Sequence, residues 1–274
     1  MKKILITGSS GYIGSHLTRM LKGEYEVYGM DKVEPQESPH TFYHCDINRP
    51  FSLEDEFDAV IHLAALVNVG ESEIKPIQYY ITNLNGTMNV LNKIKTKNFI
   101  FASTGAAQDC LSAYGISKRA AEDVVREFCT LHRPTPYTIF RFYNVIGSTV
   151  VAPTNPDGLM YNLMKARETG EFTVFGNDYD VSDDGTCVRD YVHVNEICDA
   201  LMQAIEKPSN SVESLGHGVG YTVKEIVDEF QKVNNVDFNV KYGPRRKGDI
   251  ASSVLEDVSP YMRNLYTMDQ LLKV

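Results

Sequence analysis

Three glycines between an apolar run and an amphipathic run limit most strongly what this chain can fold into. They are Gly8, Gly11 and Gly14; a strand-like run at Lys3–Thr7 precedes them, and a helical pattern at Tyr12–Leu21 overlaps the last of them. Glycine loses more conformational freedom on folding than any other residue, so this arrangement has a cost. The pattern predicts a strand, a turn and a helix where another group comes close to the backbone.

The spacing of these glycines, GxxGxxG, predicts a dinucleotide site. Gly8 allows a tight turn, Gly11 lets a pyrophosphate approach the backbone, and Gly14 lets the helix pack closely on the strand. The helix N-terminus then offers free N–H groups and the positive end of its dipole to the phosphates. A plain glycine turn is the alternative for the motif taken alone.

Acidic residues after the next two expected strands refine the cofactor prediction. Asp31 ends an apolar run at Tyr25–Met30, where a carboxylate accepts hydrogen bonds from the adenosine ribose and repels a 2′-phosphate. NAD is therefore favoured over NADP, although Lys32 beside Asp31 softens that preference. Asp46 and Ile47 follow a further expected strand and are candidates to flank the adenine; a helix cap is an equally good interpretation of Asp46.

Short apolar runs alternate with amphipathic runs through the first half of the chain. Strands are expected at Asp58–Ala65, Asn98–Ala102 and Tyr137–Val145, and helices at Pro76–Lys93 and Ser112–Thr130. Apolar runs without alternation suit strands covered on both faces, and helices between them predict right-handed crossovers. The sequence therefore predicts an α/β fold with a doubly wound parallel sheet of the Rossmann type.

The second half reads differently, with stretches rich in Pro, Gly, Asn and Asp that indicate loops. Helices are expected between and after them at Leu159–Thr169, Val194–Ile205 and Val223–Asn234. We expect a cofactor-binding Rossmann domain at residues 1–145, which the chain re-enters at least once, and a smaller substrate-binding lobe at residues 146–274.

Composition excludes several classes of function. The net charge of −9, without a basic stripe, argues against a nucleic-acid binder. The five cysteines form no CxxC pair and no metal-ligand spacing, which indicates reduced thiols and no metal site. The apolar run Ile4–Ile6 is too short for a signal peptide, and no run reaches the length of a membrane span. We expect a cytoplasmic protein that binds neither membranes nor nucleic acids.

Three polar residues in the middle of the chain suggest proton-transfer chemistry. Tyr114 and Lys118 are four residues apart, so they share one face of a helix. A lysine near a phenol is expected to lower its pKa, and such a tyrosine can transfer a proton at neutral pH. Thr104 ends the expected strand before them, where ligands bind in parallel sheets. A surface Tyr–Lys pair and a turn-forming threonine are the alternatives.

At this point the chain resembles the UDP-glucose 4-epimerase family of extended short-chain dehydrogenases/reductases. The resemblance rests on "ITGSSGYIGSHL", "VIHLAALVNVGES", "KPIQYYITNLNGT", "DDGTCVRDYVHV" and "GHGVGYTVKEIV". Related sugar-nucleotide dehydratases carry Asp-Glu after the catalytic threonine. Here Gly105 and Ala106 follow Thr104, so an acid for eliminating water is missing.

The resemblance implies NAD as cofactor and a UDP-sugar as substrate. Tyr114 would take the proton of the sugar 4-hydroxyl while C4 gives up hydride, Thr104 would hold that oxygen, and Lys118 would tune Tyr114 and bind the cofactor ribose. The 4-keto sugar would turn over and be reduced on its other face. Further implied cofactor contacts are Tyr12, Ile13, Leu63, Ala64, Ala65 and Thr82. A homodimer through the helices Tyr79–Lys93 and Ser112–Thr130 is implied as well.

The resemblance also implies a set of substrate contacts in the second half. Arg189, Arg246 and Asn144 match contacts to the diphosphate, which suits the planar fork of arginine. Asp249 matches a contact to the uridine ribose. Asn162, Leu163 and Phe175 match other substrate contacts. A solvated surface is the alternative for the basic run "RRK", and the core is the alternative for Leu163 and Phe175.

Ser253 matches a position that lines the sugar pocket. A tyrosine there restricts the family to glucose and galactose, whereas a small residue leaves room for an N-acetyl group. Interconversion of UDP-glucose and UDP-galactose, and of UDP-GlcNAc and UDP-GalNAc, is therefore the expected activity. The alternatives are a reductase or decarboxylase on the same scaffold, and a non-catalytic sugar-nucleotide sensor.

Overall fold

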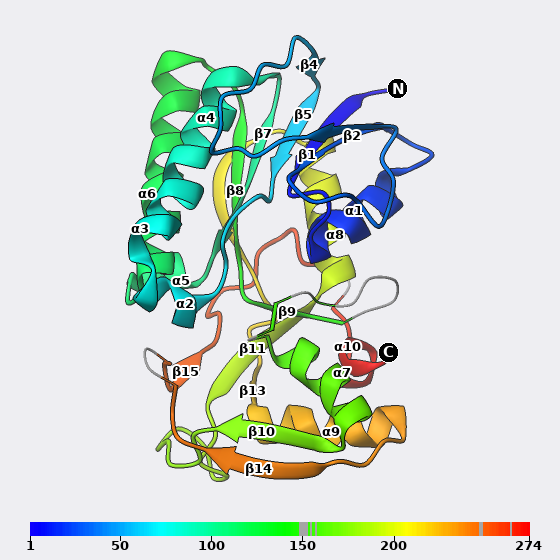
Figure 1. Cartoon of the computed structure of the whole chain (residues 1–274), viewed down its shortest axis with the longest axis vertical. Coiled ribbons are helices and arrows are strands. Elements are labelled where there is room, and N and C mark those ends of the chain that lie inside the picture. The colour runs from blue at the N-terminus through cyan, green and yellow to red at the C-terminus, as the bar shows by residue number, and fades with distance from the viewer. Residues whose placement is uncertain (148–152, 154, 157, 247–248, 264) are drawn as a thin grey trace. The chain divides into compact units, whose positions relative to one another are not determined.

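The structure is a computed structural model that describes residues 1–147, 153, 155–156, 158–246, 249–263 and 265–274. The chain forms two compact units (Figure 1). Unit 1 comprises Met1–Phe142 and Cys198–Glu213, and unit 2 comprises Tyr143–Ile197 and Ser214–Val274. The first segment of unit 1 ends at Phe142, and the division into a cofactor domain and a substrate lobe stays a prediction. The chain returns to unit 1 because a later strand joins the edge of its sheet.

Unit 1 is built on a seven-stranded sheet. In spatial order its strands are β12 (Asn210–Leu215), β8 (Tyr137–Phe142), β7 (Phe99–Thr104), β5 (Ala59–His62), β1 (Lys3–Thr7), β2 (Glu26–Asp31) and β3 (Thr41–His44). The pairs from β8 to β3 are all parallel. The direction of winding reverses between β1 and β5, and ligands bind beyond the carboxyl ends of the strands at such a point. The prediction of a doubly wound parallel sheet is confirmed.

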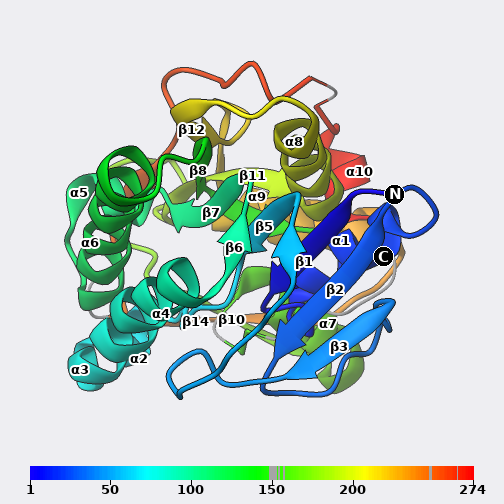
Figure 2. The same ribbon diagram turned by 90° about the horizontal axis from the view of Figure 1, so that it is seen from above.

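Helices cover both faces of this sheet. Those of unit 1 are α1 (Tyr12–Leu21), α2 (Val69–Ile74), α3 (Pro76–Tyr79), η1 (Tyr80–Asn85), α4 (Gly86–Lys93), α5 (Ala106–Asp109), α6 (Ala113–Glu127), η2 (Phe128–His132) and the Cys198–Glu206 part of α8 (Val194–Glu206). Figure 2 shows α4 and α6 on one face and α1 and α8 on the other. A small ladder of β4 (Glu56–Phe57) and β6 (Lys95–Thr96) lies apart from the main sheet.

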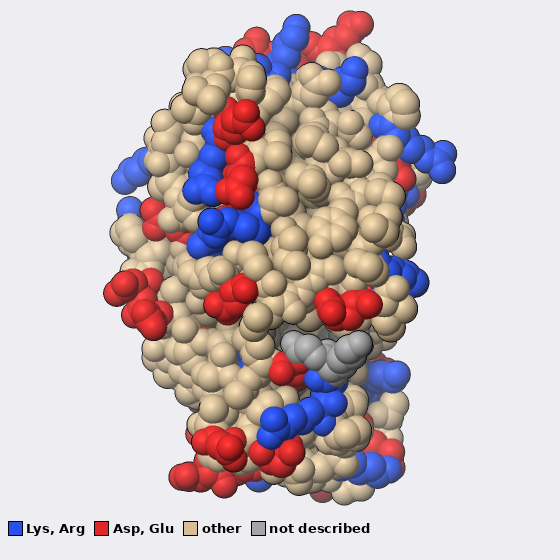
Figure 3. Space-filling view, turned by 90° about the vertical axis from the view of Figure 1, so that its left-hand side faces the viewer, with Lys and Arg blue, Asp and Glu red and all other residues tan. Residues whose placement is uncertain are grey.

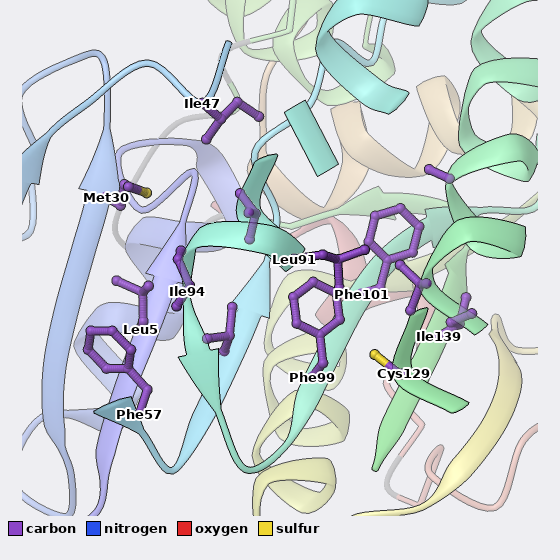
Figure 4. Packing of buried hydrophobic residues seen from close by; sticks show 14 of the residues in the cluster. Leu5, Met30, Ile47, Phe57, Leu91, Ile94, Phe99, Phe101, Cys129 and Ile139 are labelled. Carbon is purple, nitrogen blue, oxygen red and sulfur yellow. The ribbon is translucent and has the colours of Figure 1, made fainter. Parts of the chain in front are cut away.

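One buried cluster of unit 1 lies between the sheet and the helices on its α4 side. Figure 4 shows Leu5, Phe99 and Phe101 from the strands, with Leu91 and Ile94 from the end of α4 among the same cluster. All of these side chains are buried, and each contributes on the order of 1.5–3 kcal/mol by leaving water. This packing holds the carboxyl ends of the strands in place for the site described below.

Unit 2 combines short strands with helices. The strands β9 (Asn144–Ile146), β13 (Gly220–Thr222) and β15 (Ser252–Ser253) all pair with β11 (Val188–His193), while β10 (Glu171–Phe175) pairs with β14 (Asn239–Gly243). The helices are α7 (Leu159–Thr169), α9 (Val223–Asn234) and α10 (Met268–Leu272). The single strand expected at Tyr137–Val145 is wrong, because Tyr143 separates β8 from β9.

Two further features bear on the predictions from composition. Within the described ranges, no helix has the length and apolar character needed to cross a membrane. All five cysteines are described, and they are free thiols: Cys45, Cys110, Cys129, Cys187 and Cys198. The cytoplasmic location stays a prediction.

Candidate active site

The glycine loop after β1 depends on the absence of side chains. Gly8 has a φ of +74°, and a Cβ there would lie 2.7 Å from the backbone nitrogen of Ala64. A Cβ on Gly14 would lie 2.2 Å from the carbonyl oxygen of Gly8. The loop is thus a backbone cradle between β1 and α1, which only glycine permits at these positions.

The cradle has the chemistry that a pyrophosphate requires. Gly11 precedes the first turn of α1 and has no side chain to cap the helix, so the N-terminus keeps its dipole available. The hydroxyl oxygen of Ser9 is buried without a hydrogen-bond partner among the described residues. A buried polar atom of this kind points to a ligand group that satisfies it. These residues therefore fit a dinucleotide.

Asp31 lies against this cradle at the end of β2. Its carboxylate accepts hydrogen bonds from the backbone nitrogens of Ser10 at 3.0 Å and Val33 at 3.1 Å. Lys32 is exposed. The carboxylate of Asp46 accepts a bond of 2.9 Å from the nitrogen of Asn48, so it closes a turn after β3 and caps no helix. Ile47 is buried in the core of unit 1.

The segment after β5 borders the same cradle. The nitrogen of Leu63 donates to the carbonyl of Thr7 at 3.0 Å, and the nitrogen of Ala64 donates to its hydroxyl at 3.3 Å. Leu63, Ala64 and Ala65 are all partly exposed, as is Thr82 in η1. Tyr12 and Ile13 open α1 directly after Gly11. The residues expected around the dinucleotide thus surround one loop, apart from Asp46, Ile47 and Thr82, which follow β3 or lie in η1.

Tyr114 and Lys118 lie on α6, one turn apart. The helix begins after Ser112, whose hydroxyl oxygen accepts a bond from the nitrogen of Gly115 at 3.1 Å. Both side chains are buried, with 8% of Tyr114 and 3% of Lys118 exposed. Thr104, which ends β7, lies close enough to Tyr114 for its hydroxyl to lower the pKa of the phenol. Thr104 also accepts a bond from the nitrogen of Ala106 at 3.3 Å, which leaves its hydroxyl hydrogen for the phenol.

The electrostatics of this group differ from the expectation. Burial raises the pKa of Tyr114 to about 12, and only the hydrogen bond from Thr104 acts in the other direction. Burial also lowers the pKa of Lys118 to about 7, against the attraction of Glu122. The expected net lowering of the tyrosine pKa is therefore wrong for this structure. The reason is desolvation of the phenol itself, since Tyr114 is buried, and this effect outweighs any attraction by the lysine.

Two buried histidines near these elements are structural. His62 bonds to the hydroxyls of Thr7 at 2.6 Å and Thr87 at 3.0 Å, and burial lowers its pKa to about 3. Thr87 donates to a backbone carbonyl, so Nε2 of His62 carries the hydrogen and Nδ1 accepts. In unit 2, the ring of His193 stacks on Tyr266 with centroids 4.4 Å apart. Both were expected to be packed side chains.

A cluster of charges in unit 2 joins residues that are far apart in the chain. Arg189 on β11 donates to the carboxylate of Asp249 at 2.5 Å, and Arg246 donates to the same carboxylate at 3.4 Å. The guanidinium of Arg246 lies 5.4 Å from the centre of the Phe175 ring, which is 41% exposed. Ser253 pairs with Arg189 in the register of β15 and β11. Predicted diphosphate and nucleoside contacts thus meet at one edge of unit 2.

The other predicted substrate contacts have separate places in unit 2. Asn144 on β9 donates to the carbonyl of Asp190 at 3.0 Å. Asn162 on α7 donates to the carbonyls of Pro156 at 2.8 Å and Gly158 at 2.9 Å. Leu163 is fully buried in the core of unit 2. A core position was the alternative to a substrate contact for this residue.

Sequence reasoning missed two groups beside these residues. Arg245 is bonded to Asp178 at 2.7 Å and lies over the ring of Tyr179 at 4.1 Å, so this part of the basic run is not simply solvated. Glu122, one turn beyond Lys118, is buried with Arg141. The sequence feature that could have identified Glu122 is its position: it is a charged residue four positions after Lys118, on the face of the helix that is buried. No cluster of three or more potential metal ligands occurs in the described part of the chain.

Comparison with known proteins gives consistent matches. The family described as "NAD dependent epimerase/dehydratase family" matches residues 4–216. A UDP-glucose 4-epimerase of Haemophilus influenzae is 32% identical over 298 residues, which cover 91% of this chain and 88% of the relative. A probable UDP-arabinose 4-epimerase 3 of Arabidopsis thaliana is 33% identical over 320 residues, covering 96% of this chain and 75% of the relative.

A solved structure shares the fold over nearly the whole chain. The UDP-glucose 4-epimerase of Bifidobacterium longum, in complex with NAD⁺ and UDP, superposes with a TM-score of 0.85 at 27% sequence identity. The match covers 98% of this chain and 96% of that one. The resemblance seen in the motifs is therefore confirmed.

Proposed function

The chain belongs to the NAD dependent epimerase/dehydratase family, and from this premise we propose that it is a UDP-sugar 4-epimerase. We propose further that it accepts UDP-glucose and UDP-galactose, and also UDP-GlcNAc and UDP-GalNAc. The observation that carries the proposal is the arrangement of Thr104, Tyr114 and Lys118 on β7 and α6, in the unit that also holds the glycine cradle.

The reaction is derived from what these side chains can do. In its deprotonated form, as a phenolate, Tyr114 takes the proton of the sugar 4-hydroxyl and later returns it. Thr104 donates its hydrogen bond to the phenol oxygen, which stabilises the deprotonated form. The Lys118 ammonium, one turn away, adds positive charge. Bound NAD would supply the redox chemistry: it would accept a hydride from C4 of the sugar and later give it back. The cycle would therefore end without net oxidation.

The residues that would hold NAD are those of the cradle. The N-terminus of α1 would hold the pyrophosphate, and the carboxylate of Asp31 would accept hydrogen bonds from the ribose hydroxyls. We propose that residues of unit 2 bind the substrate nucleotide. The planar guanidinium of Arg189 suits a diphosphate, and the carboxylate of Asp249 suits the hydroxyls of a ribose. Asp249 now accepts the donors of Arg189, so a bound diphosphate would compete with it for the guanidinium.

Product analysis tests this proposal. The protein is incubated with NAD⁺ and either UDP-galactose or UDP-GlcNAc, and the sugars are identified by chromatography and NMR. We expect the C4 epimer of each substrate and no net NADH. Net production or consumption of NADH would instead indicate a reductase or decarboxylase. Binding of both ligands without conversion would indicate a sensor.

The replacement Ser253→Tyr tests the proposed sugar range. A tyrosine adds bulk where the proposal places the N-acetyl group, so we expect kcat/KM for UDP-GlcNAc to fall at least about 100-fold. The value for UDP-glucose should change less than about fivefold. The matched replacement Ser252→Tyr, one residue earlier on the same strand, serves as the control. Equal losses on both sugars in Ser253→Tyr would contradict the pocket argument.

We also propose a homodimer through the face of unit 1 that carries α3, η1, α4 and α6. Much of the face shown in Figure 3 is uncharged over this unit. Exposed apolar side chains on these helices are Ile77, Ile81, Met88 and Ile116. An apolar surface of this kind is typical of a protein–protein contact.

The replacement Ile81→Glu tests the dimer. A charge buried in an apolar interface lacks a partner, so we expect the dissociation constant measured by sedimentation to rise about 100-fold or more. Val258→Glu, at an exposed valine of unit 2, is the control and should leave the wild-type mass distribution unchanged. A wild-type chain that sediments as a monomer at all concentrations would refute the dimer.

A further inference from the structure

A carboxylate that the reaction does not use lies fully buried next to the reaction residues. Glu122 is on α6, one turn beyond Lys118, and 0% of its residue surface is exposed. It accepts three hydrogen bonds: from the hydroxyl of Ser103 at 2.5 Å, and from Nε and Nη2 of Arg141 at 2.9 and 2.6 Å. A buried carboxylate needs partners of this kind to remain ionised.

The two partner residues lie on neighbouring strands, one of which carries a reaction residue. Ser103 directly precedes Thr104 at the end of β7, and Arg141 lies opposite Ser103 in the register of β8. Glu122 therefore ties α6, with Tyr114 and Lys118, to the strand end that presents Thr104. A buried ion pair is weak evidence for stability, because apolar side chains of similar volume fill such a space equally well. The location of the pair argues for a role in the site.

The surroundings of Lys118 show what the carboxylate does. Phe101 on β7 offers only the face of its ring, and His62 on β5 is neutral because burial and Lys118 lower its pKa. Tyr114 on the same helix is a neutral phenol at rest, because burial raises its pKa. Arg141 on β8 offsets part of the Glu122 charge. Glu122 is the group whose attraction raises the lysine pKa against desolvation.

We propose that Glu122 is a positioning residue of the reaction: held by Ser103 and Arg141, its carboxylate keeps the ammonium group of Lys118 charged and fixes α6 against the end of β7. This inference rests on the proposed function. Lys118 must be charged to stabilise the deprotonated phenol, and a neutral amine cannot do so. Loss of the carboxylate therefore disables the lysine without touching it.

A direct titration of Lys118 tests the inference without turnover. In protein labelled with ¹³C-lysine, the Cε shift of Lys118, assigned by its loss in Lys118→Met, reports the protonation of the amine. Glu122→Gln keeps the shape and an acceptor for Ser103 but removes the charge. We expect the midpoint of the Lys118 titration to fall by about one pH unit, which corresponds to a tenfold lower proton affinity of the amine.

The pH profile of epimerisation provides the second readout. The lysine loses its proton as the pH rises, so the alkaline limb of kcat in Glu122→Gln should move to lower pH by about one unit. Arg141→Gln leaves the carboxylate without its counter-charge and should move the limb the opposite way. A merely structural pair predicts no opposite shifts, since both replacements break the same contact.

A double replacement keeps the test decisive if a single one fails to fold. Glu122→Met with Arg141→Met removes both charges and fills the space with apolar groups, which buried pairs tolerate. Its alkaline limb should move in the same direction as that of Glu122→Gln but by less, because the repulsion by Arg141 is removed as well. An active wild type whose variants keep the wild-type titration and limb would overturn the role of Glu122 alone. A wild type that converts no UDP-sugar would overturn the proposed function instead.

Discussion

Tyr114→Phe is expected to lower kcat for C4 epimerisation by about 10²–10⁴-fold. In the proposed reaction the phenol is the side chain that accepts and returns the proton of the sugar hydroxyl, whereas Thr104 supplies a hydrogen bond and Lys118 supplies positive charge. Phenylalanine keeps the ring, so the edge-to-face contact with Tyr79 persists. NAD content and the free energy of unfolding should change little.

The matched control is Tyr79→Phe. This tyrosine is also buried, and its ring centroid lies 6.3 Å from that of Tyr114, but its hydroxyl bonds to Glu71 and to the nitrogen of Asn68. Its kcat should stay within about threefold of wild type, at some loss of stability. Steady-state rates on UDP-galactose separate the two variants. A Tyr114→Phe enzyme as fast as Tyr79→Phe would remove Tyr114 from the chemistry.

The parts that sequence reasoning placed correctly carry local signals. Strand β1 and helix α1 have the predicted bounds, because an apolar run, three glycines and a helical period fall within about twenty residues of each other. The pairing of Tyr114 with Lys118 needs only the helical repeat. These features are determined by residues close together in the sequence, so they can be predicted without knowledge of the fold.

The parts that it missed depend on distant partners. The strands β10 and β14 pair across nearly seventy residues, and each run of five residues is too short for its alternation of buried and exposed positions to stand out in the sequence. The break at Tyr143 is hidden because apolar residues resume directly after Asn144, at Val145 and Ile146. The contact of Arg189 with Asp249 spans 60 positions, so residue type indicated the chemistry while only the fold brings the two together.

The direction of the tyrosine pKa shows a further limit. The i, i+4 spacing places Lys118 near Tyr114, and charge alone predicts a lowered phenol pKa. Burial reverses that sign, and burial depends on the sheet beneath α6. Sequence spacing therefore identifies which groups interact, whereas the size and sign of their titration come from packing.

Gly14→Ala is expected to abolish retention of NAD. The added Cβ would lie 2.2 Å from the carbonyl oxygen of Gly8 and 2.8 Å from the Cα of Ser9. Both are backbone atoms, so no side chain can turn aside, and α1 must move away from the loop. Overpacking of this kind costs about 1–3 kcal/mol and displaces the helix N-terminus that faces the pyrophosphate. We expect the dissociation constant for NAD⁺ to rise at least about 100-fold.

Two glycines provide matched controls for this replacement. A Cβ on Gly70 in α2 would meet nothing closer than 3.6 Å, so Gly70→Ala should bind NAD⁺ as wild type does. A Cβ on Gly11 would lie 3.3 Å from the oxygen of Gly8, so Gly11→Ala should have an intermediate effect. Calorimetric titration with NAD⁺ ranks the three variants, and circular dichroism checks that each is folded.

The order of these affinities tests the cradle itself. If NAD⁺ lies on the Gly8–Gly14 loop, affinity falls in proportion to how closely each new Cβ approaches the Gly8 carbonyl, because each ångström of helix displacement lengthens the contacts to the pyrophosphate. If the cofactor lies elsewhere, Gly14→Ala lowers the stability of the protein, but its dissociation constant for NAD⁺ equals that of Gly70→Ala. A folded Gly14→Ala protein that binds NAD⁺ with wild-type affinity would therefore contradict the placement of the dinucleotide at the turn after β1.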